Sequence, residues 1–392
     1  MGFGKVDCGS DRVNILVLNY EYPPLGGGAG PVCRQLSEAY VCRGHTVEVV
    51  TMAYGNLPRQ ETLNGVHISR VPALRKRMET CETPEMLSYV FSAFPRVVGR
   101  LRRGDIDVIH CHFLIPTGLL AWAATRIVRV PYIVTAHGSD VPGFNPDRFK
   151  SEHRVTGPLL RTIAGEAHAV VTPSLYLQDL ARQSIRTGRY RHIPNGIGAE
   201  SLNDGPKRKR LLMAGRLLPR KGFQHVLRAL EDVESDFEIH IAGDGPLRSE
   251  MEEAAKRLRM KVVFHGWVDH GSAALRELYE SASIFCLPSE RENASIALLE
   301  AMLAGAAVVT SNDTGCAETI GDAGFTVTPG DLAGLREALV PLLQSESLCA
   351  EWGTRARQRV LDRYTWTAIT ASYLDLLNEA ATTRRGAKRG DN

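Results

Sequence analysis

Two cations stand close together in the second half of the chain. Arg216 precedes Lys221 by five residues in the segment 215–222, which follows a short apolar run and opens into a predicted helix from Phe223. A guanidinium binds a diphosphate through paired hydrogen bonds, and an ammonium contributes a point charge. At the end of a strand, the two cations would stabilise the negative charge that develops on a departing nucleoside diphosphate. The simpler alternative is a pair of solvated surface cations.

Two acidic residues follow, with seven positions between them. Glu292 falls in a loop predicted after a strand at 284–287, and Glu300 falls more than one turn inside a helix that Ser295 could cap. Carboxylates placed in this way can accept hydrogen bonds from separate hydroxyl groups of one extended ligand, such as a sugar and a ribose. A solvated loop acid and a helix-face acid are the plain alternative, and paired acids also occur in glycosidases. The nearby cations favour a diphosphate ligand over a glycosidase.

A glycine-rich loop follows the first predicted strand and reads Pro-Leu-Gly-Gly-Gly-Ala-Gly over residues 24–30. Glycines let backbone N–H groups approach an anion, and the N-terminus of the next helix adds a favourable dipole. The loop does not match G-x-G-x-x-G, because Pro31 stands at the last glycine position, and it lacks the Gly-Lys-Ser/Thr of a P-loop. It could form a tight strand–helix turn or a cradle for a phosphate or a sugar.

Histidines stand at the ends of two further predicted strands. His137 begins the sequence His-Gly-Ser-Asp, and this position favours a functional role over that of a buried structural histidine. Asp140 could contact a sugar or acceptor hydroxyl, or cap a helix. His110-Cys111-His112 looks like a metal cluster, but on a strand the two histidines point one way and the cysteine the other. We therefore expect no metal there and treat the segment as a strand end on the acceptor side.

Short apolar strands alternate with helices along the whole chain. Strands are predicted at 13–18, 47–51, 106–110, 132–135, 169–172 and 191–193, and again at 211–214, 237–242, 262–265, 284–287 and 307–310, with helical stretches such as 117–128 and 175–184 between them. This alternation is typical of parallel sheets covered on both faces, whose ligands bind beyond the carboxyl ends of the strands. Residues 198–210 form a polar segment that ends in Lys-Arg-Lys-Arg, as expected of a linker between two Rossmann-like domains.

These boundaries predict an N-terminal domain over 1–200, a C-terminal domain over 205–365, a final helix over about 366–380, and a disordered basic tail over 382–392. No apolar run approaches the roughly 18–20 residues that span a bilayer, and the N-terminus has no apolar core of a secretory signal. The eight cysteines are scattered without a C-x-x-C pair, which is typical of a reducing compartment. We therefore expect a cytoplasmic protein.

The net charge of +3 is unevenly distributed, with 23 Lys and Arg against 17 Asp and Glu in residues 1–200. This surplus is too small to indicate nucleic acid, and we expect no nucleic-acid partner. Residues 94–103 are basic and partly apolar. They could be a solvated helix face, or they could dock peripherally on the anionic inner face of a membrane, which would suit a lipid-linked acceptor. The sequence does not indicate an oligomeric state.

The chain resembles the family-4 glycosyltransferases, which are retaining enzymes of the GT-B fold, over nearly its whole length. The motifs that carry the resemblance, in the expected order, are Gly26-Gly27-Gly28, His137-Gly138-Ser139-Asp140, Pro194-Asn195-Gly196, Gly215-Arg216 with Lys221-Gly222, Gly243-Asp244-Gly245-Pro246, and Glu292-x7-Glu300-Ala301-Met302. The resemblance implies two Rossmann-like parallel α/β domains facing across a cleft, with the final helix crossing back onto the first. It also implies a nucleotide-sugar donor and a hydroxyl acceptor as substrates, with no covalent nucleophile, bound metal or other cofactor.

The resemblance also implies a role for each motif. Arg216 and Lys221 would hold the donor diphosphate, Glu300 the ribose and Glu292 the hydroxyls of the donor sugar, while His137 would lie near the transferred sugar. Further donor contacts would come from Gly27 and Gly28 at the diphosphate and sugar, from Gly243 and Gly245 with the backbone of 266–268 at the nucleobase, and from Asn293, Ala294 and Ser295 beside the sugar. Many family members have Gly-Phe-Gly at this last position, so the identity of the sugar stays open.

We therefore expect a metal-independent retaining glycosyltransferase that moves a hexose-type sugar from a UDP- or GDP-sugar to a glycan, a lipid-linked sugar or a small alcohol. A sugar-nucleotide epimerase of the same architecture is one alternative. An inactive nucleotide-sugar-binding partner protein is another, although the intact cations, acids and His137 argue against it. An NAD-dependent oxidoreductase is disfavoured because no complete G-x-G-x-x-G is present.

Overall fold

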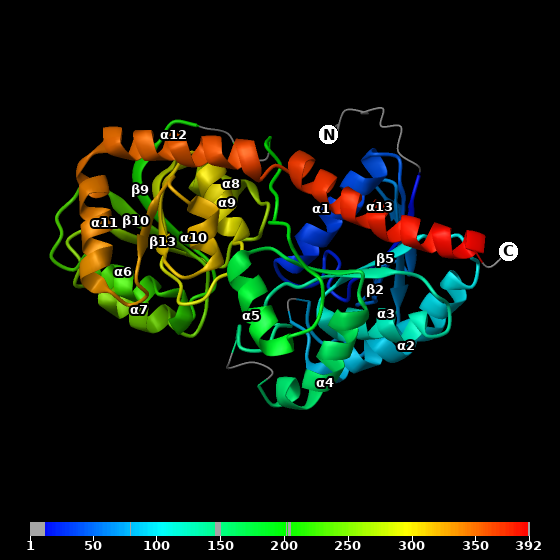
Figure 1. Ribbon diagram of the computed structural model, residues 1–392. Coiled ribbons are helices and arrows are strands. Elements are labelled where there is room, and N and C mark those ends of the chain that lie inside the picture. Colours follow the sequence, from blue (N-terminus) through cyan, green and yellow to red (C-terminus); the bar gives the residue numbers. More distant parts are fainter. Residues whose placement is uncertain (1–11, 79, 146–149, 201, 203–204, 391–392) are drawn as a thin grey trace. The chain divides into compact units, whose positions relative to one another are not determined.

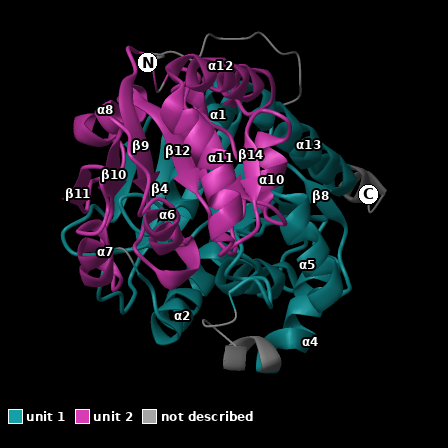
Figure 2. Ribbon diagram, turned by 90° about the vertical axis from the view of Figure 1, so that its left-hand side faces the viewer, with its two compact units in different colours: residues 1–194, 366–392 teal, residues 195–365 magenta. Residues whose placement is uncertain are grey.

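The computed structural model describes residues 12–78, 80–145, 150–200, 202 and 205–390. The chain divides into two compact units, shown in different colours in Figure 2. Unit 1 comprises the residues up to Pro194 together with those from Trp366 onward, and unit 2 comprises Asn195–Thr365. Each unit is described by itself.

Unit 1 contains an eight-stranded sheet in the order β3-β4-β2-β1-β5-β6-β7-β8. Its strands are β1 Asn14–Leu18, β2 Thr46–Met52, β3 Gln60–Leu63, β4 Val66–Val71, β5 Val108–His112, β6 Tyr132–Thr135, β7 Ala169–Thr172 and β8 Tyr190–His192. All neighbouring strands pair in parallel except β3, which is antiparallel to β4. The central strands β1, β5, β6 and β7 are almost wholly buried, which is why they read as continuous apolar runs in the sequence.

Helices cover this sheet. They are α1 Ala29–Cys42, α2 Thr83–Leu101, α3 Leu119–Thr125, α4 Lys150–Glu166, α5 Leu175–Ile185 and α13 Trp366–Gly390, with a short π-helical turn at Leu114–Gly118. Although α13 is last in the chain, it packs against α1, β5 and β6 (Figure 1). The buried hydroxyl of Tyr373 on α13 lies 3.3 Å from the hydroxyl of Thr135 on β6. The final helix is therefore part of the core of unit 1.

Two features of unit 1 differ from the sequence-based expectations. The hairpin β3–β4 was not expected, although Asn64 and Gly65 at its turn both have positive φ, as a two-residue type I′ turn requires. The predicted disordered tail from Thr382 is wrong as far as Gly390, because α13 continues through these residues. Arg384 is buried, and the guanidinium of Arg385 donates to the carbonyl of Arg12 at 2.9 Å, so the basic residues contribute contacts to the helix. Residues 391–392 lie outside the described residues.

Unit 2 contains a six-stranded, wholly parallel sheet in the order β11-β10-β9-β12-β13-β14. Its strands are β9 Arg208–Ala214, β10 Glu238–Ala242, β11 Val262–Gly266, β12 Ala282–Leu287, β13 Ala307–Ser311 and β14 Phe325–Val327. Its helices are α6 Phe223–Ala229, α7 Arg248–Ala255, α8 Ala273–Ser281, α9 Ile296–Leu303, α10 Gly315–Ile320, α11 Leu332–Gln344 and α12 Glu346–Arg363. The predicted linker is shorter than expected, since its basic end already belongs to β9.

The strand order reverses at one point in each sheet. In unit 1, β1 lies between β2 and β5, and in unit 2, β9 lies between β10 and β12. In open α/β sheets, the loops at the carboxyl ends of the two strands beside such a switch point diverge and leave room for a ligand. The fold thus designates the loops after β1 and β5 in unit 1, and those after β9 and β12 in unit 2.

No helix in the described part of the chain is both long enough and apolar enough to cross a membrane. The seven cysteines in this part are all free thiols, and Cys8 lies outside it.

Candidate active site

The loop after β9 carries both predicted cations. Backbone hydrogen bonds from Gly215 N to Ala242 O and from Leu217 N to Asp244 O, each 2.9 Å, tie this loop to the loop after β10. A short 3₁₀ turn, Pro219–Lys221, then leads into α6 through Gly222, whose φ is +73°. A side chain at Gly222 would collide with the carbonyl of Pro288, so the loops after β9 and β12 are in direct contact.

Lys221 and Glu292 meet at the switch point of unit 2. The Lys221 ammonium forms an ion pair with Glu292 Oε1, and both side chains are largely shielded, with exposures of 17% and 14%. The hydroxyl of Ser289 donates to the same carboxylate oxygen at 3.2 Å. Arg216 on the same loop is exposed and forms no ion pair with any residue that the structure describes. The site therefore holds one neutralised cation, one uncompensated cation and one acid.

The segment after Glu292 is fixed by its backbone. Asn195 Nδ2 donates to the carbonyl of Ala294 at 2.8 Å, and the thiol of Cys316 lies 3.5 Å from the carbonyl of Asn293. Ser295 caps α9, as predicted, by accepting a hydrogen bond from Leu298 N at 3.4 Å. The N-terminal end of α9 therefore lies beside the Lys221–Glu292 pair.

Glu300 lies on α9 and is already engaged. His270 Nε2 is 3.1 Å from Glu300 Oε1, and the side chain of Tyr279 on α8 is a second neighbour of this carboxylate. The hydrogen bond to Glu300 raises the pKa of His270, against the opposing effect of burial. Burial above all, and the Glu300 charge in addition, raise the pKa of Tyr279 well above its usual range, so its hydroxyl stays protonated. Neither His270 nor Tyr279 was predicted as a site residue, since one lies in a polar loop and the other on the apolar face of α8.

Gly243 and Gly245 allow two loops to pass very close to one another. A side chain at Gly243 would collide with the carbonyl of Gly215, and a Cβ at Gly245 would lie 2.5 Å from the carbonyl of Leu217. Gly243 N donates to the carbonyl of Gly266 at 2.7 Å. These glycines therefore join the loops after β9, β10 and β11 into one ledge along the carboxyl edge of the sheet.

The glycine loop of unit 1 follows β1. Gly27 and Gly28 are exposed, a Cβ at either would meet no atom within 4 Å, and Gly28 immediately precedes α1. Gly26 and Gly30, by contrast, pack against Glu21. Gly27 and Gly28 thus leave space for a ligand at the N-terminus of α1, whereas Gly26 and Gly30 form the turn.

His137 follows β6 and stacks on His112, which in turn contacts the tilted ring of His110. His137 Nε2 lies 3.0 Å from His112 Nδ1, and the rings of His112 and His110 are 4.5 Å apart. Burial lowers the pKa of His137 to about 3, and it lowers the pKa values of His110 and His112 as well. The three rings are therefore neutral at ordinary pH. His112 was expected only at a strand end, and its contact with His137 was not foreseen.

Asp140 serves the backbone around His137. Its carboxylate accepts hydrogen bonds from the backbone N–H groups of His137 and Gly138, each at 3.0 Å, and of Leu114 at 2.8 Å. Burial raises the pKa of Asp140, and these three N–H groups oppose that effect. One interpretation of the sequence made Asp140 a helix cap. In the structure it instead stabilises the loop that carries His137.

The structure assembles the predicted residues in two groups. Unit 1 carries Gly27, Gly28 and His137, and unit 2 carries Arg216, Lys221, Gly243, Gly245, Glu300 and the segment 292–295. Within the described residues, no group of three or more His, Cys, Asp or Glu side chains is placed to hold a metal ion.

The basic segment 94–103 covers the end of α2 and the turn after it. Its Arg100 forms ion pairs with Glu48 and Asp105.

Comparisons with known proteins agree with this arrangement. The family model described as Glycosyltransferase Family 4 matches residues 26–201, and the one described as Glycosyl transferases group 1 matches residues 208–345. The phosphatidyl-myo-inositol mannosyltransferase of Mycobacterium leprae is 31% identical over 391 residues, covering 94% of this chain and 96% of the relative.

Solved structures share the fold. Sucrose-phosphate synthase from Thermosynechococcus elongatus superposes with a TM-score of 0.80 at 20% identity, covering 95% of this chain and 100% of that one. The Anabaena protein HepE in complex with UDP-glucose gives a TM-score of 0.71 at 19% identity, covering 94% and 100% of the two chains. The two parallel α/β units thus have the GT-B fold, and the chain belongs to the family-4 glycosyltransferases of group 1.

Proposed function

We propose that this glycosyltransferase moves a hexose-type sugar from a UDP- or GDP-sugar to a hydroxyl group of an acceptor, with retention of configuration and without a metal. The observation that carries the proposal is the Lys221–Glu292 ion pair at the switch point of unit 2, with Arg216 exposed on the same loop. A strand-end loop with two cations suits a diphosphate, and an acid beside it suits the hydroxyls of an attached sugar.

Donor binding would proceed as an exchange of partners. The diphosphate would take the ammonium of Lys221 and the guanidinium of Arg216, and this would release Glu292 to accept hydrogen bonds from the sugar. In the absence of donor, Lys221 keeps the largely shielded Glu292 from standing as an unpaired charge. The two cations would then neutralise the charge that grows on the leaving diphosphate, a task for which other transferases use a divalent ion.

The remaining roles are those that the family resemblance implies. Glu300 on α9 would exchange His270 for the ribose hydroxyls. His137 is neutral, so it would serve the transferred sugar as a hydrogen-bonding group and not as a cation. Retention would follow if the acceptor attacked from the face that the phosphate leaves, with a phosphate oxygen accepting the acceptor's proton.

The names of similar proteins support the substrate classes. HepE was solved with UDP-glucose, and the mycobacterial relative is named for transfer of mannose to a phosphatidyl-myo-inositol lipid. A glycan, a lipid-linked sugar or a small alcohol could therefore accept the sugar. We propose that the enzyme acts in the cytoplasm, and that the basic segment 94–103 contacts the inner face of the membrane through the exposed Arg102, together with the exposed Phe91 of α2, when the acceptor is a lipid.

A donor panel tests the proposal. UDP, GDP and their hexose conjugates should raise the melting temperature of the chain, and the best donor should release its nucleoside diphosphate slowly in water and faster with an acceptor. Arg216→Ala should weaken the binding of that nucleotide about tenfold or more, because a charge-assisted contact is lost. Conversion of the donor to its epimer without transfer would reveal an epimerase, and binding without turnover would reveal an inactive binding protein.

A further inference from the structure

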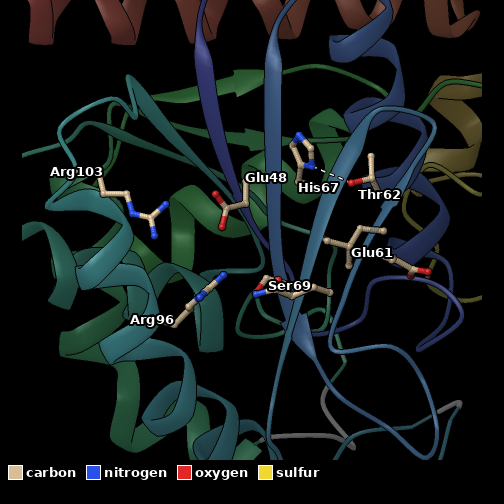
Figure 3. A pocket seen from close by; sticks show the side chains of 9 residues that line it. Glu48, Glu61, Thr62, His67, Ser69, Arg96 and Arg103 are labelled. Atoms are coloured by element: carbon tan, nitrogen blue, oxygen red, sulfur yellow. Dashed lines mark hydrogen bonds between the residues drawn. The ribbon is translucent and has the colours of Figure 1, made fainter.

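A pocket lies in unit 1, between the edge of the sheet and the end of α2 (Figure 3). Its volume of about 410 Å³ is of the size that takes a small ligand. The lining residues are Glu48, Gln60, Glu61, Thr62, His67, Ile68, Ser69, Arg96 and Arg103. None of them belongs to the candidate active site.

The strand register explains why polar groups gather on this face. Glu48 of β2 pairs with His67 of β4, which pairs with Thr62 of β3, so the three side chains form one cross-strand row. In the next row on the same face, Ser69 pairs with Gln60. Thr62 Oγ1 and His67 Nδ1 are 2.9 Å apart. The unexpected β3–β4 hairpin therefore supplies the hydroxyl and amide groups of the pocket.

The arginines come from the opposite side. Arg96 and Arg103 are seven residues apart along α2 and the turn after it, which places them on the same side of the helix about 10 Å apart. Both are exposed, and Figure 3 shows their guanidinium groups directed toward the strands.

The charges of the pocket do not cancel. Glu61 is paired with Arg70 at 2.5 Å, and Glu48 is paired at 2.6 Å with Arg100, which also pairs with Asp105. In and around the pocket, four arginines therefore face three acids. Neither Arg96 nor Arg103 forms an ion pair with a described residue. The pocket therefore presents two guanidinium groups that form no ion pair, and a surplus of one positive charge, beside a row of hydroxyl, amide and imidazole groups.

We propose that this pocket binds a phosphate-bearing sugar or polyol. Guanidinium groups bind phosphate oxygens through forked hydrogen bonds, and the side chains of Thr62, Ser69 and Gln60 can exchange hydrogen bonds with the hydroxyls of the ligand. Glu48 and His67 stand in the first halves of their strands, toward the edge opposite the switch point of this sheet. The site is thus separate from the carboxyl-edge loops and does not depend on the proposed transfer reaction.

Calorimetric titration of the full chain tests the site with glucose 6-phosphate and myo-inositol 1-phosphate as probes. Both should bind, and more tightly than inorganic phosphate or glucose alone. The double variant R96Q/R103Q should bind them about tenfold more weakly or worse, because it loses two charge-assisted contacts. Arg102→Gln, on an exposed arginine between the two that does not line the pocket, should leave the affinity unchanged. Binding of UDP or GDP should be the same in all variants.

Vesicles of phosphatidylcholine with and without phosphatidylinositol identify the source of the ligand. Arginine-dependent binding to both the soluble probes and the phosphatidylinositol vesicles would indicate a lipid headgroup, and binding to the soluble probes alone would indicate a free sugar phosphate. The proposal is overturned if neither soluble probe binds, if R96Q/R103Q binds them as the wild type does, or if inorganic phosphate binds equally well. Arginine-dependent vesicle binding without binding of the soluble probes would also overturn it, since it would show a surface contact and no pocket.

Discussion

His270 occupies the carboxylate at which we propose that the donor ribose binds. Its ring nitrogen lies 3.1 Å from Glu300, and this hydrogen bond raises the pKa of the histidine above its ordinary value. Below that pKa the imidazolium holds Glu300 most strongly, and the contribution of the pair to stability is lost as the pH rises through it. A nucleotide must therefore displace a charged partner at low pH and a neutral one at high pH.

We predict that nucleotide affinity rises with pH through the raised pKa of His270. Calorimetric titration with UDP and GDP from about pH 5.5 to about pH 8.5 measures this dependence. His270→Asn should flatten the curve and bind more tightly than the wild type at the acidic end. His192→Asn, at an exposed histidine of β8, should preserve the wild-type curve. A wild-type affinity that is flat or falls with rising pH would refute the displacement of His270.

The role of a residue could be predicted from the sequence where it depends on residues nearby in the chain. Ser295 could be predicted as a helix cap because capping is a local interaction. Lys221 and Glu292 were each expected at the site, but their ion pair was not, because it depends on the strand order that brings their two loops together. His270 could not be predicted, because its partner Glu300 lies thirty positions away and nothing in the loop indicates the pairing. The sequence left the role of Asp140 open, because its hydrogen bonds to three backbone N–H groups depend on the folded loops.

At the scale of the elements, the ledge in unit 2 depends on loops that touch through glycine. Gly243 has a φ of +147°, and any side chain there would collide with the backbone of Gly215. A backbone carbonyl cannot move aside as a flexible side chain can, so the loops after β9 and β10 would have to separate.

We predict that Gly243→Ala lowers the free energy of unfolding by at least about 2 kcal/mol and weakens nucleotide binding. Urea unfolding followed by tryptophan fluorescence and circular dichroism measures the first effect, and titration with UDP and GDP the second. Gly205→Ala is the matched control in unit 2, because that position has space for a Cβ and no positive φ. Equal unfolding midpoints for Gly243→Ala and the wild type would contradict the close packing of the ledge.

Most strands were predictable because those of a parallel sheet are buried on both faces and read as apolar runs. β6 and β7 match their predicted bounds, whereas the edge hairpin β3–β4 was missed because Gln60–Leu63 is mostly exposed and has no such run. Helix α4 lies between two predicted strands, as the alternation of strands and helices requires, but no bounds were predicted for it.

At the scale of the whole chain, the last helix shows what local patterns cannot reveal. A helix near 366–380 was predicted from the sequence, but its packing on α1, β5 and β6 is a long-range contact that only the family resemblance implied. The same holds for the predicted site residues, of which Gly27, Gly28 and His137 belong to unit 1 and the others to unit 2. Resemblance supplied the roles of these residues, and the structure supplies the contacts within each unit.

Release of nucleoside diphosphate from a UDP- or GDP-hexose, by the intact chain and by Lys221→Ala, tests the proposed transfer reaction most directly. We predict turnover by the wild type and a loss of about 10²–10³-fold in the variant, because one stabilising charge at the leaving diphosphate is removed. Lys256→Ala should match the wild type, since this exposed lysine of unit 2 pairs only with Glu253 in the described structure. Melting temperatures would show that all three proteins are folded. Undiminished turnover by Lys221→Ala, or no turnover of any such donor by the wild type, would contradict the account.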